Sequence, residues 1–125
     1  MGSPERDCAA GADAHVAGPA EYEAASDLLR ALASPTRVAI VLRLQDRPQC
    51  VHEVVGALSL SQPLVSQHLR VLKDAGVVRG NRSGREIIYE LVDHHLAHIV
   101  TDALTHAMEP RRAAEPARGD GEVSR

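Results

Sequence analysis

The sequence predicts a mainly α-helical domain with one small β-hairpin, assembled as a homodimer. Apolar residues recur at helical spacing through most of residues 21–75, which is typical of amphipathic helices. Two short runs with β-branched residues, 77–79 and 86–91, flank a polar stretch that contains two glycines, as expected of a hairpin. The chain holds no Phe or Trp and only two Tyr. A small aliphatic core has little stability to spare, so dimerisation is expected to support it.

The 125 residues divide into one folded domain and two tails. Residues 1–19 are rich in Ala, Gly, Asp and Pro without an apolar period, so we expect a disordered N-terminal arm. The folded domain is expected over residues 20–109, and a disordered polar tail over residues 110–125. Because the chain has two cysteines, no signal peptide and no apolar run of about 18 residues, the sequence predicts a cytoplasmic protein without a disulfide framework or membrane contact.

Four helices are expected before the hairpin, over 21–32, 34–46, 50–58 and 62–75. The second begins at Ser34-Pro35, where Ser caps the helix and Pro fits its first turn. Asp46-Arg47-Pro48 ends it, because proline cannot continue a helix. Gly76 stops the fourth helix. The residues of the fourth helix expected to face inward are Leu64, Val65, Leu69 and Leu72.

Two strands and a final helix complete the predicted order. The strands are expected at Val77-Val78-Arg79 and over 86–91, joined by a hairpin tip over 80–85. The final helix runs from about Asp93 to Met108, and Pro110 ends it. A short helix, a tight turn, a polar second helix and a basic hairpin, in this order, are typical of a winged helix-turn-helix.

The charge distribution suits a nucleic-acid partner. The whole chain has a net charge of -3, but residues 61–85 hold five basic residues and one acidic residue. Ser and Gln side chains at the leading end of the fourth helix suit base edges and phosphates in a major groove, and arginines on the hairpin suit the backbone or the minor groove. The alternative is an ordinary solvated helix and hairpin. The predicted DNA-binding residues are Ser61, Gln62, Ser66, Gln67, Arg70, Arg82 and Arg85.

Two pairs of metal-ligating residues mark the ends of the last predicted helix. Asp93 and His95 lie at its start, and His106 and Glu109 lie at its end. All four are ligand types that suit a borderline metal such as zinc. His95 and His106 share a helix face but are about 16 Å apart along the axis, so one ion cannot reach both pairs. Two copies of the helix packed antiparallel would bring start and end together and form two equal sites at a dimer interface.

Other uses of these histidines stay open. His94 and His98 are four residues apart, a spacing that forms a two-ligand chelate on one helix face. The polar residues of this helix are alternatively a solvated surface. Four nitrogen and oxygen ligands fit zinc, but cobalt fits them as well. Nickel would recruit further ligands from His94, His98 or the N-terminal arm.

Four motifs follow one another along the chain: Ala33-Ser34-Pro35-Thr36-Arg37, Ser61-Gln62-Pro63-Leu64-Val65-Ser66-Gln67-His68-Leu69, Lys73-Asp74-Ala75-Gly76-Val77-Val78 and Gly84-Arg85-Glu86-Ile87-Ile88-Tyr89. Together they resemble the arsenic-repressor/SmtB (ArsR/SmtB) family of bacterial metal-sensing repressors, over roughly residues 25–109. The Asp-x-His and His-x-x-Glu pattern of the last helix is similar to that of the zinc-sensing branch.

The resemblance implies a ligand set and a mode of action. It implies that Asp93 and His95 bind metal together with His106 and Glu109 of the other subunit. It also implies that the apo-dimer binds double-stranded operator DNA, an inverted repeat, and that the metal-bound dimer leaves it.

The resemblance also implies a second candidate metal site. In some relatives a thiolate site forms between the helix that starts near Cys50 and the N-terminal arm of the other subunit. Here Cys50, His52 and Glu53 stand on that helix, and Cys8 and His15 lie on the arm. The strong soft-metal site of the family has Cys-x-Cys, whereas the second position here is His52. The alternative is that Cys50 is a small buried residue.

The sequence therefore predicts a zinc-responsive transcriptional repressor that is not an enzyme and takes no small-molecule substrate. A nickel- or cobalt-responsive repressor of the same fold and a metal-independent DNA-binding or redox regulator are the alternatives. An enzyme is not expected, because four protein ligands leave no open position for a catalytic water. A metal buffer would not need the basic hairpin.

Overall fold

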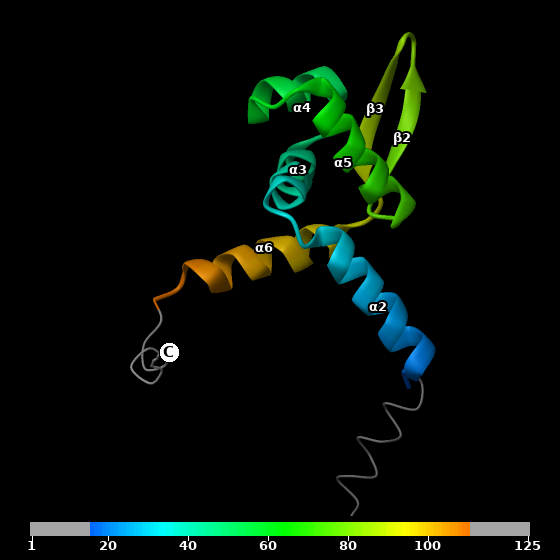
Figure 1. Cartoon of the computed structure of the whole chain (residues 1–125), viewed down its shortest axis with the longest axis vertical. Coiled ribbons are helices and arrows are strands. Elements are labelled where there is room, and N and C mark those ends of the chain that lie inside the picture. Colours follow the sequence, from blue (N-terminus) through cyan, green and yellow to red (C-terminus); the bar gives the residue numbers. More distant parts are fainter. Residues whose placement is uncertain (1–15, 111–125) are drawn as a thin grey trace, which may run out of the picture.

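The computed structural model describes residues 16–110 (Figure 1). Of the residues predicted to be disordered (1–19 and 110–125), 1–15 and 111–125 lie outside the described residues, whereas Pro19 already belongs to the first described helix. The domain limits of 20–109 stay a prediction. Within residues 16–110, the helices lack the length and apolar character of a membrane span. The elements are, in chain order, α2 (Pro19–Leu32), α3 (Pro35–Asp46), β1 (Gln49–Cys50), α4 (Val51–Leu58), α5 (Gln62–Asp74), β2 (Val78–Ser83), β3 (Glu86–Leu91) and α6 (His94–Met108).

Side-chain caps fix where α3, α5 and α6 begin. Ser34, Ser61 and Asp93 each accept a hydrogen bond from the backbone N–H three residues later, at 3.3, 3.3 and 3.2 Å. Each cap satisfies a donor that the first helical turn leaves unpaired. The helix start predicted at Ser34-Pro35 is confirmed.

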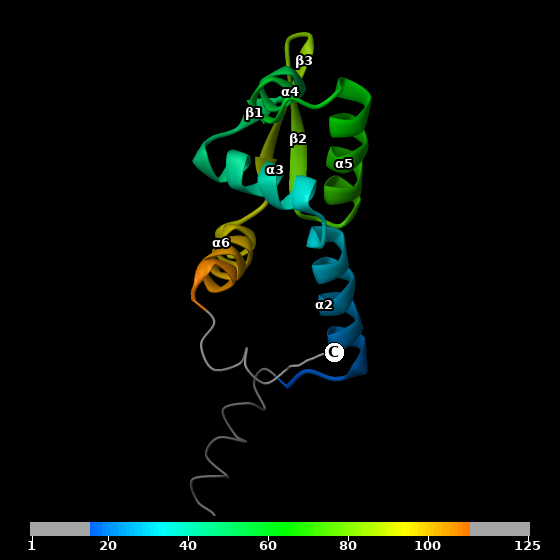
Figure 2. The ribbon, with the colours of Figure 1, turned by 60° about the vertical axis from the view of Figure 1, so that its left-hand side comes forward.

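Helix α3 lies at the centre of the molecule (Figures 1 and 2). Helices α4 and α5 and the β2–β3 hairpin lie on one side of it, whereas α2 and α6 extend away from the other side and diverge. Because α3 packs against α4, α5, α6 and β3, it connects both parts. The core is aliphatic, as predicted, and its buried members include Ile40, Val41, Val54, Val65, Leu69, Leu72, Val77, Val78, Leu96 and Val100.

The hairpin has a longer first strand and a shorter tip than predicted, whereas β3 keeps the predicted bounds of 86–91. β2 continues to Ser83, and the antiparallel register pairs Arg82 with Ile87. The two-residue turn that remains, Gly84-Arg85, has Gly84 at φ 64°, a backbone conformation that glycine adopts readily. The prediction of a tip over 80–85 was wrong because the polar residues before Gly84 belong to an edge strand, where polar side chains are common.

A third strand, β1, was missed by the sequence prediction. It pairs with β3 through Gln49 opposite Tyr89 and Cys50 opposite Ile88, so the sheet order is β1-β3-β2. Cys50 was predicted to begin a helix, but it lies in β1 and serves as the N-cap of α4, which begins at Val51. A two-residue strand is too short to produce a periodic pattern in the sequence.

One predicted core position of α5 was wrong. Val65, Leu69 and Leu72 are buried at spacings of four and three residues, which define one helix face. Leu64 precedes this stripe in the first turn and is 38% exposed. Its position beside the stripe directs it to the solvent rather than to α3 and α4.

Candidate metal centre and nucleic-acid interface

The first carboxylate–histidine pair lies at the start of α6. Asp93 is the N-cap residue of α6, and its Oδ1 accepts the hydrogen bond that caps the helix. His95 Nδ1 lies 3.6 Å from the same oxygen. The His95 side chain is 89% exposed and that of Asp93 is 48% exposed. Since a carboxylate has about four lone-pair sites, capping leaves Asp93 capacity to bind a metal.

The second pair lies at the end of α6. Glu109 is the C-cap residue, and its Oε1 lies 3.8 Å from His106 Nδ1. The side chains of His106 and Glu109 are 90% and 62% exposed. Both pairs therefore present nitrogen and oxygen ligands to the surroundings of the chain and not to its core.

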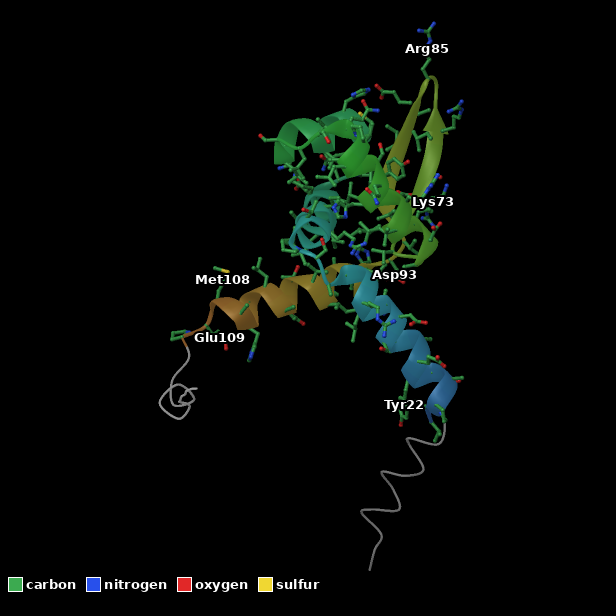
Figure 3. The ribbon with its side chains drawn as sticks, viewed as in Figure 1. Tyr22, Lys73, Arg85, Asp93, Met108 and Glu109 are labelled. Carbon is green, nitrogen blue, oxygen red and sulfur yellow. The ribbon has the colours of Figure 1, made fainter. Side chains whose placement is uncertain are left out.

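The two pairs are too far apart to share an ion within one chain. Figure 3 shows Asp93 and Glu109 at opposite ends of α6, and the helix rise separates His95 from His106 by about 16 Å. Within the described residues, no three His, Cys, Asp or Glu side chains gather closely enough to hold one ion. Within one chain, each end of α6 therefore offers two candidate ligands and no more.

His94 and His98 lie on the first turns of α6 and are both exposed. His94 also lines a surface pocket of about 450 Å³ together with Asp46, Arg47 and Glu90. The position of both histidines near the start of α6 sets the alternative chelate apart from the second pair at the helix end. By itself it offers two nitrogen ligands.

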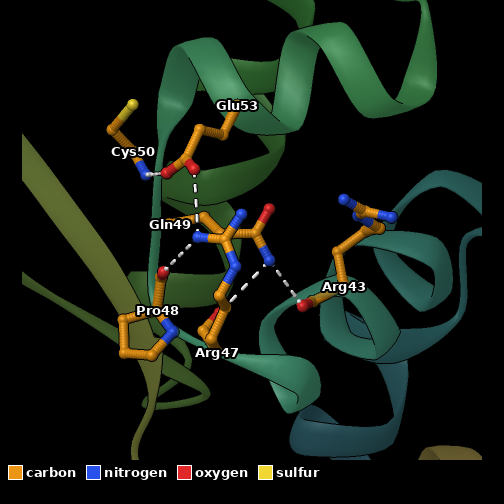
Figure 4. A network of polar contacts seen from close by, with 6 residues as sticks. All are labelled: Arg43, Arg47, Pro48, Gln49, Cys50 and Glu53. Atoms are coloured by element: carbon orange, nitrogen blue, oxygen red, sulfur yellow. Dashed lines mark hydrogen bonds and ion pairs between the residues drawn. The ribbon is translucent and has the colours of Figure 1, made fainter.

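The residues of the second candidate metal site are divided by the fold. Cys50 is 6% exposed, and with His52 it lines a cleft of about 310 Å³ between α4, α5 and the hairpin. Glu53 instead binds the backbone: its Oε1 accepts the N–H of Cys50 at 3.0 Å, and its Oε2 lies 3.0 Å from Arg47 Nη1 (Figure 4). Cys8 and His15 lie outside the described residues.

Glu53 is held as a carboxylate by these partners. The hydrogen bond from the Cys50 backbone, and then the one from Arg47, lower the pKa of Glu53 below its usual value. A metal at Glu53 would have to share its two oxygens with both partners. Sequence reasoning missed this capping role, because Cys is an unusual residue at a position where Ser or Thr normally starts a capping box.

The predicted DNA-reading side chains are exposed on one end of the molecule. Gln62, Ser66, Gln67 and Arg70 lie on the exposed side of α5, whereas Ser61 uses its Oγ to cap that helix. Gln62 and Ser66 share the 310 Å³ cleft with two predicted residues of the hairpin, Arg82 and Arg85. The polar start of α5 and the basic hairpin therefore border one cleft.

The arginines of the hairpin differ in their partners. Arg79 Nε donates to Glu90 Oε2 at 2.8 Å, and Asn81 donates to the same oxygen at 2.9 Å. Arg79 first, and then Asn81, lower the pKa of Glu90. Arg82 and Arg85 form no ion pair with any acidic side chain of residues 16–110. Arg85 lies at the free end of the hairpin (Figure 3).

Gly80 fixes the packing across the hairpin. A Cβ atom at this position would lie 2.8 Å from Ile87 Cγ2 and 3.2 Å from Tyr89 Cε1. Both neighbours come from β3 and line the cleft that also holds Arg82. The absence of a side chain at Gly80 lets the two strands bring these residues together.

The similarity to known proteins covers the helices and the strand described above. The family description "Bacterial regulatory protein, arsR family" matches residues 34–79, from the cap of α3 into β2. The chain is also 38% identical over 92 residues to the HTH-type transcriptional regulator NmtR of Mycobacterium tuberculosis, a match that covers 71% of this chain and 77% of that protein. The chain belongs to the arsR family.

This arsR-family chain is 66% identical over 87 residues to the HTH-type transcriptional repressor SmtB of Mycobacterium tuberculosis. The match covers 70% of the chain and 64% of SmtB, so the chain spans less than two thirds of that relative. Both relatives are named as transcriptional regulators, in agreement with the prediction that the chain is not an enzyme.

A solved structure confirms the winged helix-turn-helix fold. The domain Mb0332 of Mycobacterium bovis, described as a homodimeric winged helix-turn-helix DNA-binding domain, superposes with a TM-score of 0.66 at 23% identity. The superposition covers 70% of this chain and 82% of that structure. In this fold α4 and α5 are the helix-turn-helix, and β2–β3 is the wing.

Proposed function

We propose that the chain is a zinc-responsive transcriptional repressor that acts as a homodimer, binds operator DNA without metal and leaves it when zinc is bound. One observation carries this proposal: α6 presents an exposed carboxylate–histidine pair at each end, and two such pairs would supply four ligands to one ion. A structural zinc site takes four ligands. The similarity to SmtB and NmtR supports a regulator of this kind.

The proposed dimer packs α6 antiparallel to α6 of a second copy. The start of one helix, with Asp93 and His95, then faces the end of the other, and a two-fold axis makes two equal sites. An apolar groove of about 380 Å³ between α2 and α6 supports this arrangement, because it leaves Leu29 and Leu104 54% and 40% exposed. The structural neighbour Mb0332 is itself described as homodimeric.

The proposed DNA-binding face consists of the exposed side of α5 and the wing. α5 enters the major groove, where Gln67 and Arg70 meet base edges and phosphates, and Arg82 and Arg85 neutralise phosphates beside it. Because the dimer is two-fold symmetric, its operator is an inverted repeat of two half-sites.

Release requires a change in the shape of the dimer. Each proposed site holds two carboxylates, so a bound Zn²⁺ brings it to neutrality, which by charge alone would strengthen DNA binding. When bound, the ion would fix the spacing of the two α6 helices. Since α6 packs on α3, the chain can transmit this spacing to α5 and the wing. Coupling between two such sites is typically about 1–3 kcal/mol.

The test is a zinc titration followed by the fluorescence anisotropy of labelled operator DNA. His106→Ala is expected to keep the apo DNA affinity and to lose zinc-induced release, because His106 lies at the far end of α6 from the wing. His94→Ala is the matched control on the same helix and is expected to respond as the wild type does. Release of the His106→Ala variant at wild-type zinc concentrations would refute the proposed ligand set.

Two further experiments test the alternative metals and the second candidate metal site. Parallel titrations with cobalt and nickel show which metal releases DNA at the lowest free concentration. Cys50→Ser tests the second candidate site, and unchanged zinc release in this variant removes that site from the response. If the DNA affinity of the wild-type protein with each of the three metals equals that of the metal-free protein, a metal-independent regulator is the reading that remains.

A further inference from the structure

We infer that Gln49 is a positioning residue that links the sensing helix α6, through α3, to the wing and the helix-turn-helix. This inference rests on the proposed function and adds the route by which the two ends of the molecule communicate. No ligand contact is assigned to Gln49. Its role is to keep the end of α3 fixed to the DNA-reading elements.

The Gln49 side chain caps the C-terminal end of α3 by donating to its last carbonyl groups. Its Nε2 donates to the backbone oxygens of Arg43 at 2.7 Å and of Arg47 at 3.2 Å (Figure 4). A helix leaves its last carbonyl groups without partners inside the helix, so this amide supplies donors that the backbone lacks. Gln49 is 1% exposed, the most buried polar residue of the described chain.

The backbone of the same residue belongs to the sheet. Gln49 pairs with Tyr89 of β3, so it attaches the end of α3 to the wing strand. The next residue, Cys50, is the N-cap of α4 and begins the helix-turn-helix. A second tie runs beside it, because Glu53 of α4 binds both the Cys50 N–H and Arg47 after α3. The end of α3, the wing and α4 therefore meet at one junction.

A separate polar contact joins α3 to the sensing helix. Thr101 Oγ1 donates to Gln45 Oε1 at 3.3 Å, and Thr101 lies on α6 between its two ligand pairs. Gln45 lies in the last turn of α3, between the Arg43 and Arg47 carbonyl groups that Gln49 binds. A shift of α6 that moves this turn of α3 therefore acts on the groups bound by Gln49.

The junction also holds hydrogen-bonding capacity that this arrangement does not use. Gln49 Oε1 is buried and has no hydrogen-bond partner among the described residues. The two carbonyl groups fix the amide orientation, because exchanging its N and O would set three oxygens against one another. Buried polar atoms without partners are rare in native proteins. An arrangement of the junction that brought a donor to this oxygen would gain a hydrogen bond that the present one lacks.

The principal test is Gln49→Met, which keeps the length of the side chain and removes both donors. The measured quantity is the ratio of the DNA dissociation constants with and without saturating zinc. Mutations that interrupt a coupling route change this ratio by about 2- to 30-fold, and we expect a decrease in that range. The apo DNA affinity and the zinc stoichiometry are expected to equal those of the wild type, since Gln49 lies on neither surface.

Thr101→Val tests the same route from a half-buried position, where loss of folding is not expected. It removes the hydroxyl but keeps the β-branched shape, and it should also reduce the ratio. Thr105→Val, one turn further along α6 at an exposed position, is the matched control and should leave the ratio unchanged. The double variant Gln49→Met with Thr101→Val should lose no more coupling than the stronger single variant, because both lie on one route.

Amide hydrogen exchange in the metal-free protein gives a readout independent of zinc. Gln49→Met is expected to speed exchange in residues 47–50 and in β3 while leaving α6 protected. A variant that weakens apo and zinc-bound DNA affinity equally, so that the ratio stays at its wild-type value, would overturn the inference. If Gln49→Met does not fold, an unchanged ratio in Thr101→Val overturns it. A wild-type ratio of one would instead overturn the proposed function, and this inference with it.

Discussion

Replacing both Arg82 and Arg85 with alanine is expected to weaken DNA binding and to reduce its dependence on salt. Both side chains are exposed on the wing and free of ion pairs within residues 16–110, so they are available to phosphates. Each phosphate neutralised on duplex DNA contributes about 0.9 to the slope of log K against log salt. Two arginines on each of two subunits make four contacts, so the slope should become shallower by about 3.6.

The assay is DNA-binding anisotropy of the metal-free protein at several salt concentrations, with operator and unrelated DNA. The loss should be similar on both DNAs, because phosphate contacts carry no sequence information. The matched control is Arg79→Ala combined with Glu90→Ala, which removes an ion pair of 2.8 Å from the same wing and leaves its net charge unchanged. A wild-type slope in the Arg82 and Arg85 double variant would refute the phosphate contacts.

Three further changes test the fold around the sites. Gly80→Val brings Cβ to 2.8 Å from Ile87 and should destabilise the wing by about 1–3 kcal/mol, visible as a lower Tm; an unchanged melting curve would contradict this packing. Glu53 has a lowered pKa, so its carboxylate stabilises the fold above pH 4.5, and this contribution is lost as the pH falls through the folded value. Melting curves of Glu53→Gln and wild type should therefore differ at neutral pH and converge in strong acid. Leu69→Ala should cost about 2–5 kcal/mol in chemical unfolding, whereas Leu64→Ala should cost much less because Leu64 is exposed; equal losses would restore Leu64 to the core.

Local signals made much of the fold predictable. The start of α3 follows from Ser34-Pro35, because a cap and a first-turn proline act within a few residues of each other. The same local chemistry predicted the order of helices and the hairpin. β1 and the length of β2 were not predictable in this way, since a strand of two residues exists only through its pairing with β3, which lies about forty residues later in the chain.

The candidate sites also differ in whether they depend on local sequence signals or on contacts between distant elements. Ligand type and spacing on a single helix predict candidate ligands at the ends of α6. His95 and His106, 11 residues apart, fall on one helix face. The roles of Gln49 and Gly80 depend on atoms from other elements: the carbonyl groups at the end of α3 and the side chains of β3. No pattern within a helical or strand period reports such contacts. From the sequence alone, Gln49 is indistinguishable from a surface polar residue and Gly80 from a turn residue.

The groove between α2 and α6 offers a way to distinguish a zinc site shared by two subunits from one held by a single chain. Leu104 lines this groove and is 40% exposed. Leu104→Asp places a charge on the apolar surface that the proposed dimer buries, and an unpaired buried charge strongly opposes association. The variant is expected to sediment as a folded monomer that keeps all four ligand residues.

This monomer distinguishes a zinc site shared by two subunits from a chelate of histidines within one chain. If Asp93 and His95 need His106 and Glu109 of a second copy, the monomer holds only half-sites, and its zinc affinity in competition with a chromophoric chelator should fall far below that of the wild type. Wild-type zinc affinity should then rise with protein concentration, because ligand binding and dimerisation are linked. A chelate of His94 and His98 lies within one chain and would survive in the monomer. Wild-type zinc affinity in monomeric Leu104→Asp would therefore exclude the shared site, whatever the effect of zinc on DNA binding.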